Sequence, residues 1–336
     1  MPGEWIARRQ GIAYVCSTPL LETSSANPTI VDISCLVSDD LEPLWVQERT
    51  LWRDVLYWDI APVISAIRRA VDRRTLAGKV ALAGQKTLGY GYYMREGHRA
   101  VIGSLAFLPG VNVTEVGARI LDSLIAPLES DPSVTRIESQ FVSFGGERLD
   151  DEFVSRGFDV HQRAFLRRSM ADVPLESPLI PSLIIDFWDT SCLERAAKLM
   201  QRAHEGRVDA QMNELYRTQV GCQALLQNIL FQSGCGKLIP SASLVARDGA
   251  GELAGFVVST EISPRNAHLA QLAVGPDAQG RGLGRSIVIR TLHALARRGY
   301  ETVSLMVSGS NQRAFSLYES AGFENVFEFP VFSWDR

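Results

Sequence analysis

Residues 268–286 read HLAQLAVGPDAQGRGLGRS, and this stretch decides the fold class of the surrounding chain. Five of its first seven residues are apolar, which is typical of a buried β-strand. Gly280, Gly282 and Gly284 then alternate with other residues before helical spacing begins. A helix N-terminus presents unpaired backbone N–H groups and a positive dipole end, and glycines let a pyrophosphate approach them. The stretch therefore predicts a strand–turn–helix site for an anionic, nucleotide-type ligand.

Two other glycine-rich phosphate motifs are excluded by the spacing. The stretch is not GxxxxGK[ST], so a P-loop does not fit. It also lacks the GxGxxG pattern after an opening strand, with an acidic residue about 20 positions later, that marks dinucleotide-binding folds. These residues alone also allow a purely structural helix start, in which the glycines only shape the turn.

The hexapeptide 279–284, QGRGLG, fits the Q/R-x-x-G-x-G/A signature of the GCN5-related N-acetyltransferase (GNAT) superfamily. The preceding residues 272–274, LAV, resemble that family's cofactor-binding strand. Further along, residues 311–323, NQRAFSLYESAGF, are similar to the family's second pattern, N-x-x-A-x-x-L-Y-E-x-x-G-F. On these two patterns in this order, residues 182–336 are identified as a member of the superfamily.

The resemblance implies that two parallel strands, residues 268–274 and 302–307, splay apart and that the cosubstrate acetyl-CoA binds in the gap. Asn311 would bond the pantetheine arm or fix the following helix. The resemblance assigns acetyl-CoA binding to Leu272, Ala273, Val274, Gln279, Gly280, Arg281, Gly282, Leu283, Gly284, Arg285, Asn311 and Tyr318.

The same resemblance places Tyr318 where the family often has the acid that protonates the leaving thiolate. A phenol with a pKa of about 10 can donate a proton while staying neutral at pH 7. The alternative is a tyrosine that only packs beneath the cofactor.

The base that removes a proton from the acceptor amine has several candidates. His268 lies on a strand that resembles the corresponding strand of the arylalkylamine acetyltransferases, although Ala270 stands where a second histidine would be. Glu205, with His204 and Asp209 beside it, falls in a region that usually lines the acceptor pocket in this fold. The alternative for His268 is a histidine that only begins a strand. The alternative for the Glu205 region is a solvated loop.

The first half of the chain repeats the second. Residues 104–109, SLAFLP, match residues 271–276, QLAVGP, at an offset of 167, and the same offset pairs Gly117 with Gly284. We expect an α/β fold with a mixed sheet flanked by helices, in two tandem GNAT-like domains. The expected segments are an N-terminal extension, a degenerate domain, a proline-rich linker and the acetyltransferase domain, at residues 1–28, 29–171, 172–181 and 182–336.

The first copy departs from the acetyl-CoA signature. Asn112 stands at the position of Gln279, and Glu115 stands at that of Gly282, where a carboxylate would repel a pyrophosphate. We therefore expect this copy to pack against the active one and to shape the acceptor cleft. Trp45 and Trp52 share one face of a helix expected over residues 44–60, either in the core or as an aromatic wall for an acceptor.

Composition limits the class of protein. The chain has 336 residues, a formal net charge of −4 and 46% hydrophobic residues, so general nucleic-acid binding is not expected. No apolar run is long enough for a membrane span, and the five cysteines include no CxxC pair. We expect a cytoplasmic monomer or homodimer with reduced thiols and no metal site.

The sequence thus predicts an acetyl-CoA-dependent N-acetyltransferase acting on a primary amine of a small molecule. Three alternatives stay open: a protein or peptide acetyltransferase, an enzyme that uses another acyl thioester, and a non-catalytic acyl-CoA-binding module.

Overall fold

The computed structural model describes residues 27–139, 149–173 and 183–336. Most of the expected extension and linker, residues 1–26 and 174–181, lies outside these ranges, so the domain boundaries stay predictions. We call residues 27–173 the N-terminal half and residues 183–336 the C-terminal half.

The two halves contain the same order of main elements, as the internal repeat predicts, apart from the short α6 and β8 that the C-terminal half has in addition. In the N-terminal half these are β1 (Thr29–Asp32), α1 (Glu42–Leu56), α2 (Ala61–Asp72), β2 (Ala77–Ala83), β3 (Lys86–Glu96), β4 (Arg99–Phe107), α3 (Val113–Ser130), β5 (Arg136–Ser139), α4 (Asp150–Ser155) and β6 (Asp159–Ser169). In the C-terminal half they are β7 (Ile184–Phe187), α5 (Leu193–His204), α6 (Asp209–Met212), α7 (Gln219–Phe231), β8 (Lys237–Leu238), β9 (Leu244–Arg247), β10 (Leu253–Ser263), β11 (Asn266–Val274), α8 (Leu283–Ala296), β12 (Thr302–Ser308), α9 (Gln312–Ser320) and β13 (Glu324–Asp335).

The strands of both halves join one mixed sheet, in the order β1-β2-β3-β4-β5-β13-β6-β12-β11-β10-β9-β7, with β8 beside β10. The pairs β4–β5 and β11–β12 are parallel, and the other pairs are antiparallel. Apolar side chains of α8 and α9 form one core cluster with the sheet, and those of α5 and α7 form another. The expected mixed sheet with flanking helices is confirmed.

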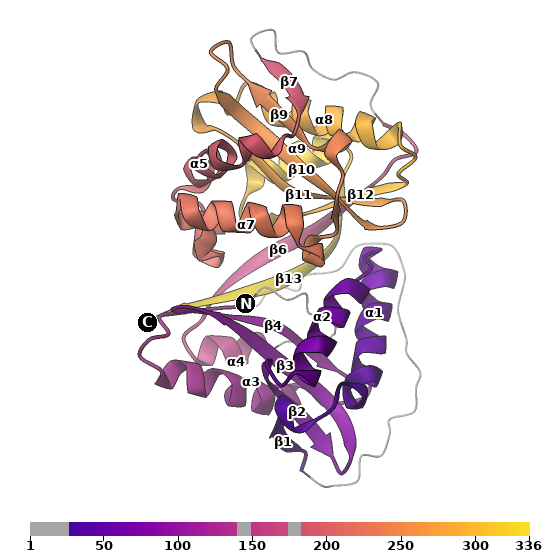
Figure 1. Cartoon of the computed structure of the whole chain (residues 1–336), viewed down its shortest axis with the longest axis vertical. Helices are drawn as coiled ribbons and strands as arrows, with labels where there is room; N and C mark the ends of the chain where they lie inside the picture. Colours follow the sequence, from indigo (N-terminus) through magenta and orange to yellow (C-terminus); the bar gives the residue numbers. More distant parts are fainter. Residues whose placement is uncertain (1–26, 140–148, 174–182) are drawn as a thin grey trace, which may run out of the picture.

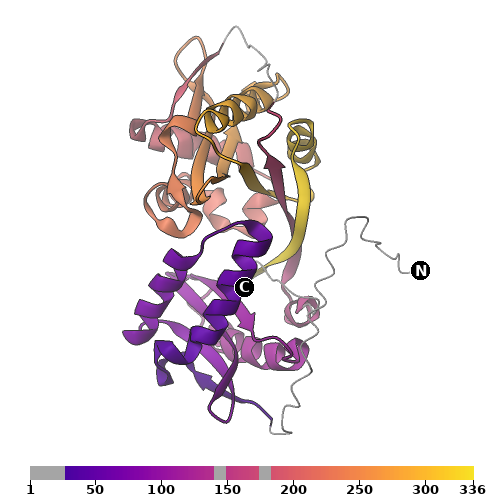
Figure 2. The same ribbon diagram turned by 90° about the vertical axis from the view of Figure 1, so that its right-hand side faces the viewer.

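The last strand of each half crosses into the other half. β6 lies between β12 and β13, and β13 lies between β5 and β6. Figures 1 and 2 show the two strands running side by side from one half to the other. The sheet of each half is therefore completed by the final strand of the other half.

The tryptophan segment differs from the helix expected over residues 44–60. α1 ends at Leu56 because Tyr57 adopts a left-handed conformation, with φ of 57°, and a second helix, α2, begins at Ala61. Trp45 is fully buried and donates to Tyr90 Oη at 3.2 Å. Trp58 lies between the helices, with its ring centroid 4.8 Å from that of His268 on β11. The segment thus contributes to the core and also to the contact between the halves.

Candidate functional site

The parallel strands β11 and β12 separate partway along their length. They pair only over residues 266–269 and 302–305, while β11 continues to Val274 and β12 to Ser308. Ala270 is an extra residue opposite β10, where the register steps from Leu269 to Gln271. Such a bulge bends a strand away from its neighbour. Past the bulge, residues 272–274 pair with β10 but have no pairing with β12.

The turn between β11 and α8 is fastened to both neighbouring elements by Gln279. Its side-chain amide donates to the Val274 carbonyl at 3.0 Å, and its Oε1 accepts from Arg313 on α9 at 3.0 Å. Leu283 begins α8 with its side chain in the core, so it can offer a ligand only its backbone. Arg281 is exposed and Arg285 is half-buried at this helix start.

Each glycine of the turn has its own structural reason. Gly280 and Gly282 have φ values of +81° and +80°, which side chains rarely adopt. A Cβ on Gly282 would meet no atom within 4 Å, so this backbone faces open space. A Cβ on Gly284 would lie 2.8 Å from Leu317 Cδ1, so this glycine lets α8 approach α9. The first turn of α8 therefore exposes backbone N–H groups to an approaching anion, and these residues fit the pyrophosphate of acetyl-CoA.

The corresponding helix start in the N-terminal half is closed. Asn112 caps α3, and its side-chain oxygen accepts from the Glu115 N–H at 3.1 Å. The cap occupies a donor that a phosphate would need, and the Glu115 carboxylate adds a repelling charge. The open helix start is thus a property of the C-terminal half, within the part of the chain that the structure describes.

Asn311 and Tyr318 lie on α9, at the other edge of the separated strands. Asn311 caps the helix by accepting from the Ala314 N–H at 3.2 Å, which is the second of the two roles expected for it. Tyr318 is buried, and its hydroxyl donates to none of the described residues. Burial, together with the nearby Asp209 carboxylate and Tyr216, raises the pKa of Tyr318 well above its ordinary value. The phenol therefore stays protonated at neutral pH.

The segment 209–217 bridges the ends of both separated strands. Asp209, the first residue of α6, accepts from Ser308 Oγ at the end of β12 at 2.6 Å. Tyr216, in the short helix Glu214–Arg217, donates to Gln271 Oε1 on β11 at 3.0 Å. The segment thus closes the face of the gap that α5 and α7 cover.

Buried charges of the N-terminal half hold this segment in place. Glu138 on β5 is fully buried and accepts from the Glu214 N–H at 2.7 Å and from Arg136 Nε at 3.0 Å. Arg136 also donates to the Gln211 carbonyl. A buried ion pair with further hydrogen bonds fixes its partners in one geometry. The N-terminal half therefore positions the segment that carries Asp209 and Tyr216.

The candidate bases near the end of α5 lie in different surroundings. Glu205 follows α5 on the surface and makes no hydrogen bond or ion pair with a described residue. His204 is half-buried, its Nδ1 donates to the Met200 carbonyl at 2.8 Å, and its ring stacks on Tyr216. Burial lowers the pKa of His204. Asp209 is the carboxylate that contacts the separated strands.

His268 is buried at the junction of the halves. Its Nδ1 lies 2.9 Å from Ser304 Oγ, and its ring lies against Trp58 and Phe165. Burial, with a smaller contribution from the Arg163 charge, lowers the pKa of His268 to about 3. The imidazole is therefore neutral at pH 7 but holds an added proton weakly.

This buried imidazole should make the free energy of unfolding depend on pH. The unfolded chain takes up a proton below about pH 6.5, while the folded chain does so only near pH 3, so stability falls as the pH is lowered between these values. From pH 7 to pH 5, His268 should remove about 2 kcal/mol. Urea unfolding of wild type and His268→Gln at both pH values measures this, because the variant should lose less stability on acidification. Equal losses would contradict the buried, neutral histidine.

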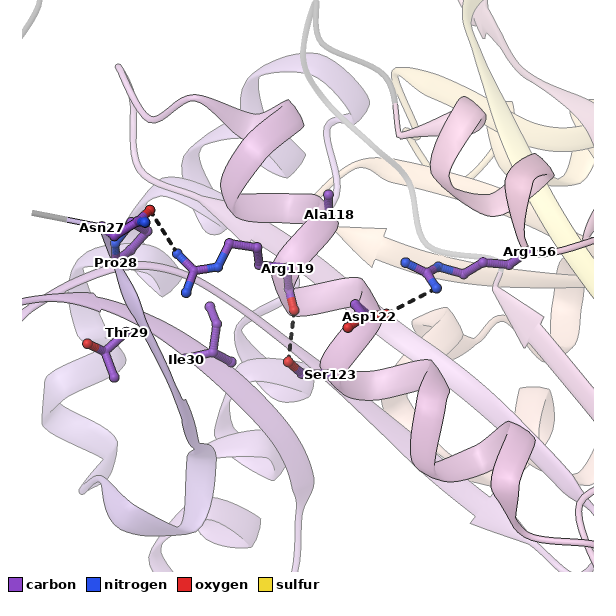
Figure 3. A pocket seen from close by; sticks show the side chains of 9 residues that line it. All are labelled: Asn27, Pro28, Thr29, Ile30, Ala118, Arg119, Asp122, Ser123 and Arg156. Carbon is purple, nitrogen blue, oxygen red and sulfur yellow. Dashed lines mark hydrogen bonds and ion pairs between the residues drawn. The ribbon is translucent and has the colours of Figure 1, made fainter.

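A shallow pocket of about 630 Å³ lies elsewhere, on the N-terminal half between β1 and α3 (Figure 3). Its charged side chains already have partners, since Arg156 pairs with Asp122 at 3.1 Å and Arg119 donates to Asn27 at 3.3 Å. No candidate residue lines it. Among the described residues, no helix combines the length and apolarity needed to cross a membrane.

The local motifs predicted the cofactor side of the candidate site, but they did not point to every residue that the structure brings to its acceptor side. Tyr216 and Gln271 had no distinguishing pattern, although a glutamine between apolar strand residues could have been noted. Arg163, on β6 of the N-terminal half, was also missed, because only the pairing of β6 with β12 brings it here.

Comparison with known proteins agrees with this architecture. Residues 213–323 match the sequence model of the Acetyltransferase (GNAT) family. A mycothiol acetyltransferase of Propionibacterium freudenreichii is 38% identical over 90 residues, which cover 26% of this chain and 29% of that protein. The [ribosomal protein bS18]-alanine N-acetyltransferase of Escherichia coli K12 is 41% identical over 76 residues, covering 23% of this chain and 51% of that protein. The matched region thus spans about half or less of each relative.

A solved structure extends the likeness to nearly the whole chain. A tandem GNAT protein from the clavulanic acid biosynthesis pathway superposes with a TM-score of 0.60 at 15% identity, covering 92% of this chain and 98% of that one. This identity is low, so the superposition bears on the fold alone. The family match over the separated strands and the glycine turn places residues 213–323 in the GNAT family, and the superposition shows that nearly the whole chain has the fold of a tandem GNAT protein.

Proposed function

We propose that this protein transfers an acetyl group from acetyl-CoA to a primary amine of a small molecule. The observation that carries the proposal is the convergence of three features in the C-terminal half. These are the gap between β11 and β12, the exposed helix start at Gly282, and the buried phenol of Tyr318.

Acetyl-CoA would supply an activated thioester whose carbonyl carbon accepts the amine nitrogen, with the C–N bond forming as the C–S bond breaks. Backbone N–H groups from Gln279 to Arg285 would hold the pyrophosphate, and residues 272–274 would pair with the pantetheine arm. Tyr318 would give its proton to the departing thiolate.

The acceptor nitrogen arrives protonated and must lose a proton before it attacks. Among the candidates, Asp209 has the position that suits an ammonium group, because it contacts the end of β12 and adds its charge to the burial that raises the pKa of both Tyr318 and Tyr216. Glu205 is exposed, and His268 holds a proton weakly. We therefore assign the ammonium contact to Asp209 and keep His268 and Glu205 as rival bases.

A small acceptor is favoured by the anchoring of the segment 209–217. Glu138 and Arg136 fix this segment from within the N-terminal half. The fixed segment would leave less room for an acceptor at the gap between β11 and β12. The likeness to the bS18-alanine acetyltransferase keeps a protein N-terminus as the second candidate acceptor.

The test is acetyl-CoA-dependent thiol release with small amines and with peptides that have free N-termini. Release with small amines at rates well above those with peptides supports the proposal. Faster release with peptides would favour the second candidate. Tight acetyl-CoA binding without release over the whole panel would identify a binding module instead.

A further inference from the structure

Arg163 is a side chain of the N-terminal half that reaches the site of the C-terminal half. It lies on β6, opposite Ser308 on β12 and Phe329 on β13. Side chains alternate along a strand, so Arg163 shares a face with Phe165, whose ring is stacked with that of His268. Ala164, on the other face, belongs to the core beneath α8.

The charge of Arg163 is not used within the described part of the chain. The side chain is half-buried, its Nε is buried without a hydrogen-bond acceptor, and it makes no ion pair with a described residue. Other arginines of the same strand have partners, since Arg167 stacks on Tyr57 and donates to the Val55 carbonyl at 3.1 Å. A guanidinium that has lost part of its hydration normally has an acceptor. Arg163 therefore has a donor to offer to a ligand.

The position of this charge follows from its neighbours. Its register partner Ser308 and its strand neighbour Phe165 place it beside Asp209 and His268. Its charge adds to the lowering of the His204 and His268 pKa values by burial, and it partly offsets the rise that burial causes in the pKa of Tyr216. The Asp209 carboxylate acts on His204 and Tyr216 in the opposite direction. Asp209 is bonded to Ser308, the register partner of Arg163, yet no ion pair joins the two charges. One cation and one anion thus flank the acceptor face without neutralising each other.

We propose that the acceptor carries a carboxylate as well as its amine, with Arg163 binding the carboxylate and Asp209 the ammonium. The planar guanidinium can bind a carboxylate through two parallel hydrogen bonds, which fixes the acceptor's orientation as well as its position. The acceptor class is then amino acids and their derivatives with a free carboxylate. This inference rests on the proposed acetyltransferase function, and it gives the N-terminal half a direct part in choosing the substrate.

The test measures thiol release with amino acids and with their methyl esters, which keep the amine and lose the charge. Wild type should prefer the acids by about tenfold or more in kcat/KM. Arg163→Gln should lower kcat/KM for the acids by about 10- to 100-fold, leaving the esters and the KM for acetyl-CoA unchanged. Arg163→Lys should retain part of the preference because it keeps the charge.

Arg167→Gln is the matched control, because it removes the same charge from the same face of β6 and should leave the preference intact. Asp209→Asn should lower kcat/KM for acids and esters alike. Equal use of acids and esters by wild type, or an equal loss on both in Arg163→Gln, would overturn the inference while leaving the acetyltransferase function standing. No thiol release with any amine would overturn both.

Discussion

Gly282→Val is expected to raise the dissociation constant for acetyl-CoA by about 100-fold or more. The reason is geometric: a Cβ at this position meets no protein atom within 4 Å and instead projects into the space in front of the α8 N-terminus. A hydrogen bond to a charged group contributes about 1.5–3 kcal/mol, so blocking two backbone donors accounts for the loss. Titration calorimetry with acetyl-CoA measures it directly.

The fold should survive this change with a modest penalty. Gly282 has φ of +80°, and a side chain in this region costs roughly 1–2 kcal/mol. Gly299→Val is the matched control, because Gly299 follows the other end of α8 with φ of +78° and likewise has no atom within 4 Å of its Cβ position. Both variants should lose similar stability, but only Gly282→Val should lose affinity. Unchanged affinity in Gly282→Val would remove the pyrophosphate site from this helix start.

Gly284→Val would give a different result, since its Cβ would collide with Leu317 Cδ1, so that this side chain or the contact between α8 and α9 must shift. The sequence signature requires glycine at position 282 and allows glycine or alanine at position 284. Their different surroundings explain why one tests ligand binding and the other tests packing.

The cofactor side of the site could be predicted because its determinants are local. Strand, turn and helix start follow one another within residues 268–286. Asn311 caps α9, which is the next helix along the chain. Backbone conformation at Gly280 and Gly282 is a property of a few consecutive residues. The expected splaying of the strands agrees with the observed end of pairing after Leu269 and Leu305.

The acceptor side could not be predicted because its parts come from distant segments. Arg163 reaches it only through the pairing of β6 with β12, and Glu138 acts on it through the 209–217 segment. The residue pattern of a strand indicates which faces it buries, but it does not specify which neighbouring strand it joins. The exchange of β6 and β13 depends on tertiary contacts between the halves, so the sequence of either half alone does not predict it.

Tyr318→Phe is expected to lower kcat by about 100-fold or more with little change in the KM for acetyl-CoA, as for the loss of a positioned general acid. The phenol is buried near Asp209, which keeps its proton in place across the neutral range. Its hydroxyl donates to none of the described residues, so the substitution removes a proton donor and leaves the packing against Phe323 in place.

Tyr300→Phe provides the matched control for this change. Tyr300 precedes β12 at the end remote from the gap, and its hydroxyl bonds Glu261. Losing this hydroxyl should leave kcat within about twofold of wild type, while single-turnover measurements should show the Tyr318→Phe defect in the acetyl-transfer step. The leaving thiolate needs less help as the pH rises towards its own pKa, so the defect should narrow in alkaline buffer. A defect of constant size across pH would point to a positioning role for Tyr318, and wild-type turnover would exclude it from catalysis.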